Sequence, residues 1–445
     1  IAVGATFATL LPSNVVKASK RGGTLSMLVQ PEVPTLASYL STSMPVGQTA
    51  SKIYDGLLEY NFDLSPRPCL AESWNVSPDG LTITFNIRKG VKFHDGHPMT
   101  SEDVRYSIME VLIKYHARGG KFKIIESIQT PDDHTVLIKL KSASPALMMA
   151  FSGYETPIIP KHLFAGKDIK NHPLANKPIG AGPFKFVEWK RGQYMRFDRN
   201  PDYWSPGQPY FDRIVVQTIP DSATRSAVLE KGDFQLAGFG AVPNNDAKRL
   251  GALPNLIVTT KGYENFSPIS ELDFNTKVKP FNNKKVRQAL AHATPSADII
   301  DAVYMGKGQA ASSLITRGTI GALEDIWPYN YDLDKAKSLL NEAGYADGFD
   351  MDLVFNLSAS THADSAIFIK DSFGKIGVNV NLKAESPAAF QEKLRKKEQP
   401  AFMYEMLSWT NDAGYSYDMI FSPWGFANYT NYDSSVVNDA IKNNW

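Results

Sequence analysis

The sequence predicts an α/β protein with more than one lobe, and three observations lead to this expectation. The chain has 445 residues, more than the ~100–200 residues of an average domain. Apolar residues alternate with period two in several short segments, which is typical of half-buried strands. Segments with helical spacing lie between them, so strands and helices alternate along the chain.

The first half of the chain contains both kinds of segment. A turn-forming Ser-Pro-Asp-Gly at 77–80 precedes one alternating segment. Thr100, followed by acids at 102 and 103, has the signature of a helix start. We expect strands at 23–29, 81–87 and 134–140, helices at 51–60 and 100–112, and a polar, Pro-containing linker at 163–178.

Residues 180–204, GAGPFKFVEWKRGQYMRFDRNPDYW, predict a β-hairpin. Strands at 184–189 and 194–199 flank a turn that contains Gly192. Gly180 and Gly182 precede a strand, whereas a phosphate-binding glycine loop must open a helix. The basic residues alternate with apolar ones or lie in the turn, so we expect them on a solvated face.

The rest of the chain continues in the same way. A strand at 212–220, a helix at 222–232 that Ser222 would cap and a strand at 233–237 form a βαβ unit. The second half repeats this order of elements. We expect helices at 285–294, 334–343, 363–376 and 387–395, and strands at 351–356, 378–382 and 401–407.

The charge balance and the cysteine count exclude several classes of protein. Lys plus Arg number 47 and Asp plus Glu 46, so no overall field attracts nucleic acid or an anionic membrane. Cys69 is the only cysteine in the sequence, so it can form neither an intramolecular disulfide nor a multi-thiolate metal site. We expect Cys69 to be a small buried apolar residue.

The first 18 residues resemble the end of a secretory signal peptide. An apolar run leads to Val16 and Ala18, the small residues of a cleavage site. We expect the mature protein to start near Ser19 and to be soluble outside the cytoplasm. The sequence has no Cys near this point for a lipid anchor.

We find no catalytic or metal-binding motif. His94 and His97 are close together, but no third ligand follows at useful spacing. A nucleophile elbow, a zinc-protease motif and a Walker loop are all absent from the sequence. We therefore expect no enzyme activity, no metal and no cofactor.

One polar, aromatic loop is a candidate ligand site. The strand at 401–407 runs directly into residues 408–418, and ligands in open α/β domains lie at the carboxyl ends of strands. Asp412 beside Trp409 could pair with a cationic ligand group, or Asp412 could only cap the loop.

Five sequence blocks, in order, resemble the family 5 extracellular solute-binding proteins, the peptide-, dipeptide- and nickel-binding receptors of ABC importers. The resemblance covers nearly everything from Gly22 onward. The blocks are residues 70–104, 180–204, 280–293, 331–345 and 409–418.

The resemblance implies a two-lobed periplasmic binding protein, type II-like, that closes on its ligand at a hinge. Lobe I would comprise residues 19–48 and 175–265, with an extra subdomain at 49–174, and lobe II would comprise 266–445. The resemblance also implies a return of the chain to lobe I at its end, which we expect to lie beyond Trp445.

The resemblance also implies which residues bind the ligand. Asp412 would take the α-ammonium of a peptide, and the strand end from Met406 to Trp409 would offer backbone groups to the extended peptide. The family loop usually continues as Asp-Pro, whereas this chain has Tyr415-Ser416-Tyr417-Asp418. The predicted ligand-binding residues are Asp412, Trp409, Asn411, Thr410, Ser408, Met406, Gln30 and Tyr429.

Several functions stay open at this stage. The best supported is a monomeric receptor that delivers an oligopeptide or dipeptide to an inner-membrane ABC permease, without binding nucleic acid. The same receptor could instead take an oligosaccharide, an opine, or a metal chelate or heme. From other classes, a secreted hydrolase would need two converging carboxylates, and a chaperone-like binder would take unfolded segments without selectivity.

Overall fold

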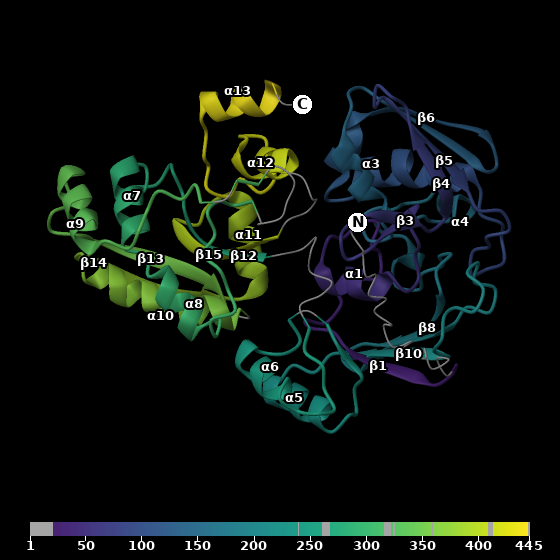
Figure 1. Ribbon diagram of the computed structural model, residues 1–445, viewed down its shortest axis with the longest axis horizontal. Coiled ribbons are helices and arrows are strands. Elements are labelled where there is room, and N and C mark those ends of the chain that lie inside the picture. The colour runs from purple at the N-terminus through teal and green to yellow at the C-terminus, as the bar shows by residue number, and fades with distance from the viewer. Residues whose placement is uncertain are drawn as a thin grey trace, which may run out of the picture.

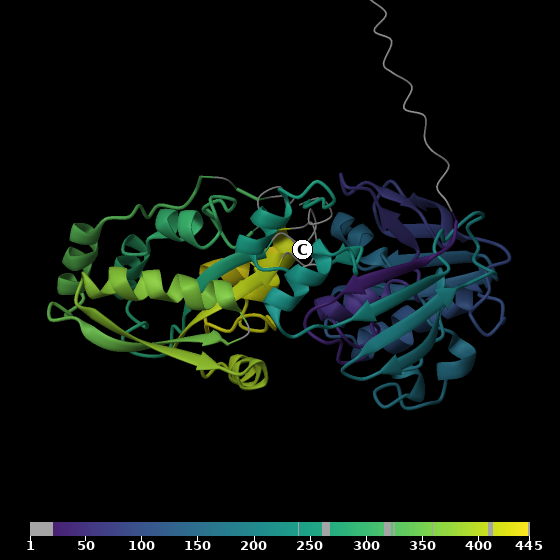
Figure 2. The same cartoon turned by 90° about the horizontal axis from the view of Figure 1, so that it is seen from below.

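The computed structural model describes residues 21–238, 240–259, 268–315, 322–323, 325–357, 359–407 and 413–443. Two groups of elements lie side by side, and β12, β15 and α12 of one group lie toward α1 (Met44–Ala50) of the other (Figure 1). The view from below also shows two bodies (Figure 2). No helix in these ranges is long and apolar enough to cross a membrane.

The first group is built on a mixed sheet in the order β11-β1-β10-β9-β8. β1 lies between β10 and β11 and is parallel to both, whereas β9 runs antiparallel to both of its neighbours, β10 and β8. Its strands are β1 (Thr24–Leu28), β8 (Phe184–Lys190), β9 (Tyr194–Arg199), β10 (Arg213–Gln217) and β11 (Leu236–Ala237). The predicted hairpin and βαβ unit are thus confirmed.

A second, antiparallel sheet in the order β4-β5-β7-β6 belongs to the same group. Its strands are β4 (Ala71–Val76), β5 (Thr82–Ile87), β6 (Ile125–Asp132) and β7 (Thr135–Leu140), and a small ribbon pairs β2 (Leu58–Tyr60) with β3 (Pro66–Pro68). Buried apolar residues of both larger sheets, such as Phe85 and Phe197, form one continuous core.

Short helical segments connect these strands. They are α2 (Ser101–Arg105), a π-helix at Tyr106–Leu112, α3 (Ile113–Tyr115), α4 (Lys161–Phe164) and 3₁₀ turns at Gly119–Ile124, Pro145–Phe151 and Pro173–Ala175. On the other face of the first sheet, α5 (Ser222–Glu230) and α6 (Asn244–Leu250) form a smaller core with Leu28.

The second group is built on a sheet in the order β12-β15-β13-β14. Its strands are β12 (Pro268–Phe274), β13 (Phe349–Asn356), β14 (Val378–Glu385) and β15 (Ala401–Leu407). Its helices are α7 (Lys284–His292), α8 (Ser296–Ala302), α9 (Leu333–Glu342), α10 (Ser360–Gly374), α11 (Pro387–Lys396), α12 (Ala413–Phe421) and α13 (Ser435–Asn443).

The two faces of this sheet have separate cores because strand residues alternate between them. Ala401 and Met403 of β15 belong to the core with α7, α9 and α10. Phe402 packs with Phe390 and Leu394 of α11.

The predicted helix at 51–60 is wrong. The helix ends at Ala50, and Leu58–Tyr60 is the strand β2. The carbonyl of Ile53 accepts a hydrogen bond from the amide of Gly182 (2.8 Å), and that of Asp55 from Ile158 (3.1 Å). Gly56 also lies against the backbone of 151–153, where a Cβ would be 2.3 Å from the nitrogen of Gly153. Contacts distant in sequence therefore replace the helix.

Two smaller predictions also need correction. Asp221, not Ser222, caps α5, because its carboxylate accepts from the amide of Thr224 at 2.7 Å. The segment 163–178 is no free linker, because Phe164 is fully buried in the core. The hairpin's arginines Arg196 and Arg199 are partly exposed and form ion pairs.

Candidate functional site

The candidate site starts from the carboxyl end of β15. Residues 402, 404 and 406 share one face of the strand, and Met406 is buried against Ile420 and Ala427. Because its side chain is enclosed in this cluster, Met406 could contact a ligand only through its backbone.

The last residues of β15 are paired along one edge only. Residues 403–407 pair antiparallel with 268–272 of β12. On the other side, the parallel ladder with β13 is confined to Val354 and Phe402 among the described residues. The far edge of Met403–Leu407 therefore carries backbone groups without a ladder partner in the described parts of the chain, and such an edge can pair with an added strand.

Most of the predicted ligand-binding residues cannot be placed. Ser408, Trp409, Thr410, Asn411 and Asp412 lie outside the described residues. The predicted loop at 408–418 needs correction from Ala413 onward, where α12 begins, and β15 ends at Leu407. The assignment of these five residues stays a prediction.

Tyr429 lies next to β15. Its ring meets that of Tyr404 edge to face, with centroids 5.4 Å apart and an angle of 74°. Both rings are partly exposed and pack with the cluster of Met406. The structure thus brings Met406 and Tyr429 together.

Gln30 lies in the other group of elements, just after β1. Its Oε1 atom is buried without a hydrogen-bond donor. The neighbouring chain segment carries Gly238, whose amide donates to the carbonyl of Leu28 at 3.1 Å, and Gly240. Gln30 therefore lies at the shared carboxyl edge of β1 and β11, and no described contact joins it to Met406 or Tyr429.

Sequence reasoning missed two acids on β12. Glu271 is opposite Tyr404 and Asp273 is opposite Phe402, so both acids lie on the face that carries Tyr404. Burial, then the neighbouring Asp273, raises the pKa of Glu271 well above its usual range. Burial also raises the pKa of Asp273 to about 7, against a lowering hydrogen bond from Glu271. The sequence signal that could have revealed them is the spacing of two acids at i and i+2 in a strand, which places both side chains on one face.

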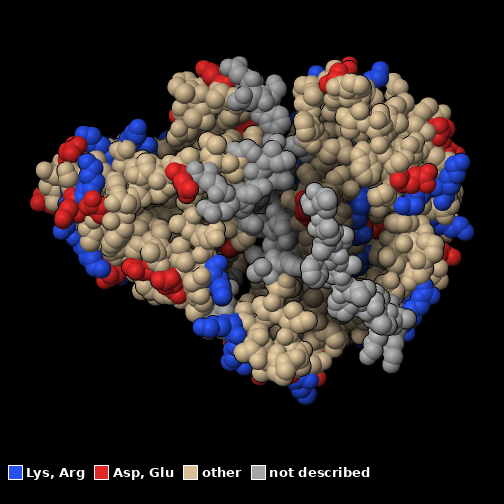
Figure 3. All heavy atoms as spheres, in the orientation of Figure 1, with Lys and Arg blue, Asp and Glu red and all other residues tan. Residues whose placement is uncertain are grey.

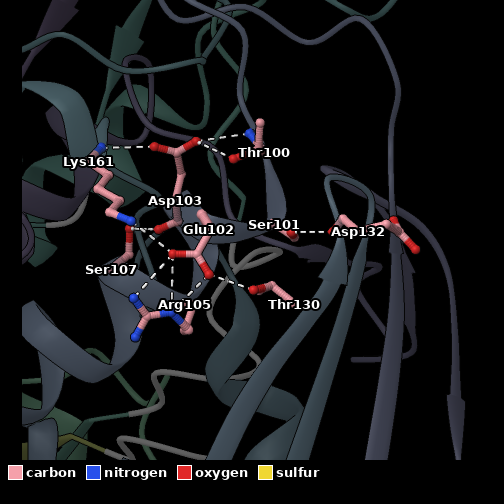
Figure 4. Close-up of polar contacts among 9 residues, drawn as sticks. All are labelled: Thr100, Ser101, Glu102, Asp103, Arg105, Ser107, Thr130, Asp132 and Lys161. Atoms are coloured by element: carbon pink, nitrogen blue, oxygen red, sulfur yellow. Dashed lines mark hydrogen bonds and ion pairs between the residues drawn. The ribbon is translucent and has the colours of Figure 1, made fainter.

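Other polar clusters have structural roles. Asp103 accepts from the amides of Thr100 (2.9 Å) and Lys161 (2.8 Å), and Glu102 pairs with Arg105 (3.0 Å) and Lys161 (2.9 Å) (Figure 4). These contacts join the start of α2 to Lys161 at the start of α4, and Thr130 of β6 also donates to Glu102. Arg105, then Lys161 and Thr130, lower the pKa of Glu102 to about 2.

The described residues offer no other chemistry that competes with the β15 site. They contain no group of three or more metal-binding side chains, and Cys69 is buried, as expected. Two surface hollows of about 280 and 590 Å³ lie at β13, β14 and α11 and contain none of the predicted ligand-binding residues. Lys, Arg, Asp and Glu are scattered over the face in Figure 3 without a patch of one sign.

The chain is similar to known solute-binding proteins over most of its length. The family described as bacterial extracellular solute-binding proteins, family 5 matches residues 65–428. The heme-binding protein A of Haemophilus influenzae is 30% identical over 88% of this chain and 75% of its own. The oligopeptide-binding protein AppA of Bacillus subtilis is 32% identical over 81% of this chain and 69% of its own.

Solved structures of binding proteins have the same fold as this chain. The chain resembles the periplasmic binding protein DppA of Helicobacter pylori in complex with the peptide STSA, with a TM-score of 0.82, 28% identity and coverage of 96% and 87% of the two chains. It also resembles AgaA of A. tumefaciens R10 in complex with agropinic acid, with a TM-score of 0.80, 29% identity and coverage of 95% and 85%. The predicted two-lobed fold is confirmed.

Proposed function

The chain belongs to family 5 of the bacterial extracellular solute-binding proteins, and on this premise we propose that it captures a short peptide and delivers it to an ABC importer. The observation that carries the proposal is the unpaired edge of β15. An extended peptide can add to this edge as a further strand, with main-chain hydrogen bonds supplying affinity that does not depend on sequence.

Asp412 would then fix the amino terminus of the peptide. In the sequence, Asp412 follows soon after Leu407, where the unpaired edge ends. Removal of water on closure would strengthen the attraction between carboxylate and ammonium. Trp409 would cover the terminus, while Ser408, Thr410 and Asn411 would offer polar groups, as in our sequence-based assignment.

The opposite side of the peptide would meet the first lobe. Gln30 has a buried oxygen that lacks a donor, and a peptide amide could supply one. We assign lobe I to residues 19–48 and 175–265, its extra subdomain to 49–174 and lobe II to 266–445. Closure at a hinge would bring Gln30 toward Tyr429 and bury the ligand, and the permease would recognise the closed form.

The protein would act in the periplasm as a monomer and catalyse no reaction on its ligand. A relative that carries the name of a heme-binding protein and a structural neighbour that holds agropinic acid favour a second candidate, the same receptor role for an opine or another non-peptide solute.

Calorimetric titration of Asp412→Asn with a tripeptide tests the proposal. We expect the tripeptide to bind the parent protein and to lose about 2–5 kcal/mol of binding free energy in the variant, because a buried ammonium loses its partner. Asp418→Asn is the matched control, since this acid accepts from the indole nitrogen of Trp424 at 2.8 Å instead. Equal affinity of Asp412→Asn and parent would refute the role of Asp412, and no binding of any tripeptide would refute the peptide receptor.

A further inference from the structure

Glu271 is a buried acid without a cationic partner. It is 8% exposed, and neither carboxyl oxygen receives a hydrogen bond from an amide, a hydroxyl or a basic group. No ion pair with Lys, Arg or His is found for Glu271 or Asp273 in the described parts of the chain. A buried charge without a partner is costly, so the pair retains a proton instead.

Glu271 and Asp273 lie two residues apart on the same face of β12, and the charge of Asp273 raises the pKa of Glu271 beyond the effect of burial. Two carboxylates repel one another, so one acid of a close pair stays protonated. Glu271 is the more deeply buried of the two, while Asp273 is partly exposed. Above the pKa of Asp273, about 7, the resting pair therefore carries a single negative charge, with the proton on Glu271.

Two partly exposed aromatic rings lie on the same face of the sheet as this pair. Tyr404 lies opposite Glu271 on the neighbouring strand, and Tyr429 packs on Tyr404. Arg395 of α11 affects the pKa of Tyr429 but forms no ion pair with either acid. Glu405 on β15 points to the opposite face of the sheet. Tyrosine rings around a carboxylate suit a basic group, which both carboxylate and ring faces attract.

The distance between the acids of β12 and a peptide strand added at β15 can be spanned only by a long side chain of the peptide. A peptide added at the unpaired edge of β15 would lie two strand spacings from β12, or about 10 Å. A short side chain could not cross this distance over Tyr404. The long, flexible stem of lysine can follow the apolar ring and place its ammonium at Glu271.

We propose that Glu271 and Asp273 form a subsite for a long basic side chain of the ligand, a specificity that rests on the proposed peptide receptor. The ammonium or guanidinium group enters between the two carboxyls, and the proton on Glu271 leaves to solvent. Both acids are then ionised and the group is held by two carboxylates.

The test compares two otherwise identical sets of tripeptides, one with lysine and the other with norleucine at each position in turn. Norleucine retains the stem and lacks the ammonium. We expect lysine at one position to bind about 10- to 100-fold more tightly, as for a hydrogen bond to a charged group. Titration at pH 8, above the pKa of Asp273, in buffers of different ionisation enthalpy should show release of about one proton for that peptide, and for no norleucine peptide.

Variants identify the residues responsible. Glu271→Gln should abolish the preference and the proton release, whereas Asp352→Asn should retain both, because Asp352 is an exposed acid on another strand of the same sheet. Equal binding of lysine and norleucine at every position would overturn the subsite while leaving the peptide receptor intact. A preference that survives in folded Glu271→Gln would overturn it as well. If no tripeptide binds, the receptor proposal and the subsite fail together.

Discussion

Glu102 in the first lobe and Glu271 in the second show two opposite environments for the same side chain. Glu102 is partly exposed and bonded to Arg105, Lys161 and Thr130, and its pKa is lowered to about 2. Glu271 is buried beside Asp273 and its pKa is raised. Satisfied acids hold the fold together, whereas an acid that the protein leaves without a cation is available to a ligand.

Among the acids that have cationic partners, buried Glu155 should give the largest loss of stability when it is replaced. It pairs with Arg118 and Lys121, all with side chains at most 5% exposed. Burial alone would raise its pKa, but the two cations outweigh this and hold it low. Glu155→Gln should lower the free energy of unfolding by about 3–5 kcal/mol, because two buried cations lose their carboxylate.

Urea unfolding measures this change, and Glu59→Gln is its control. Glu59 pairs with Arg67 at 2.7 Å on the surface, with side chains 43% and 55% exposed. The control should change stability by less than ~1 kcal/mol. Equal losses in the two variants would contradict the distinction between buried and exposed pairs.

Asp273 gives the next largest expected effect on stability. For an acid with a raised pKa, stability falls as pH rises, whereas for an acid with a lowered pKa, such as Glu102, it falls as pH drops. The folded-state pKa of Asp273, about 7, lies above the unfolded value, so its contribution to stability is present at low pH and is lost as pH rises toward 7. Between pH 4 and 8 the parent should therefore lose roughly 2–4 kcal/mol relative to Asp273→Asn. Thermal unfolding of both proteins across this range measures the difference, and a difference that is constant with pH would show that Asp273 titrates normally.

Lys161 gives the smallest effect. Lys161→Met removes one partner of Glu102, but the two side chains are 39% and 38% exposed, so we expect a loss of only ~0.2–1 kcal/mol. Because the pKa of Glu102 is lowered, this loss should be seen above about pH 4.5 and should fade as pH falls toward 2. Urea unfolding of both proteins at several pH values between 2 and 7 measures this pH dependence. A stability loss in Lys161→Met that grows as pH falls would contradict the prediction.

The sequence predicts local elements well where the signal is local. The hairpin at 184–199 needs only alternating residues and a glycine turn, and both are present around Gly192. The helix predicted at 51–60 fails because the carbonyls of Ile53 and Asp55 bond to amides more than 100 residues away. Spacing along the chain carries no information about such contacts.

The candidate site shows the same limit. The strand before the loop and the position of Met406 follow from pattern, and family resemblance suggests Asp412. In the sequence, the alternating acids of β12 would be assigned to the solvent-exposed face of a strand. Only the fold shows that Tyr404, more than 130 residues away, lies opposite Glu271 and that Tyr429 packs on Tyr404.

Native mass spectrometry of the mature protein, followed by denaturation and identification of what is released, tests the central claim most directly. The account predicts a family of short peptides with free amino termini, enriched in lysine or arginine at one position. Release of a single opine, sugar or chelate, and no peptide, would contradict it.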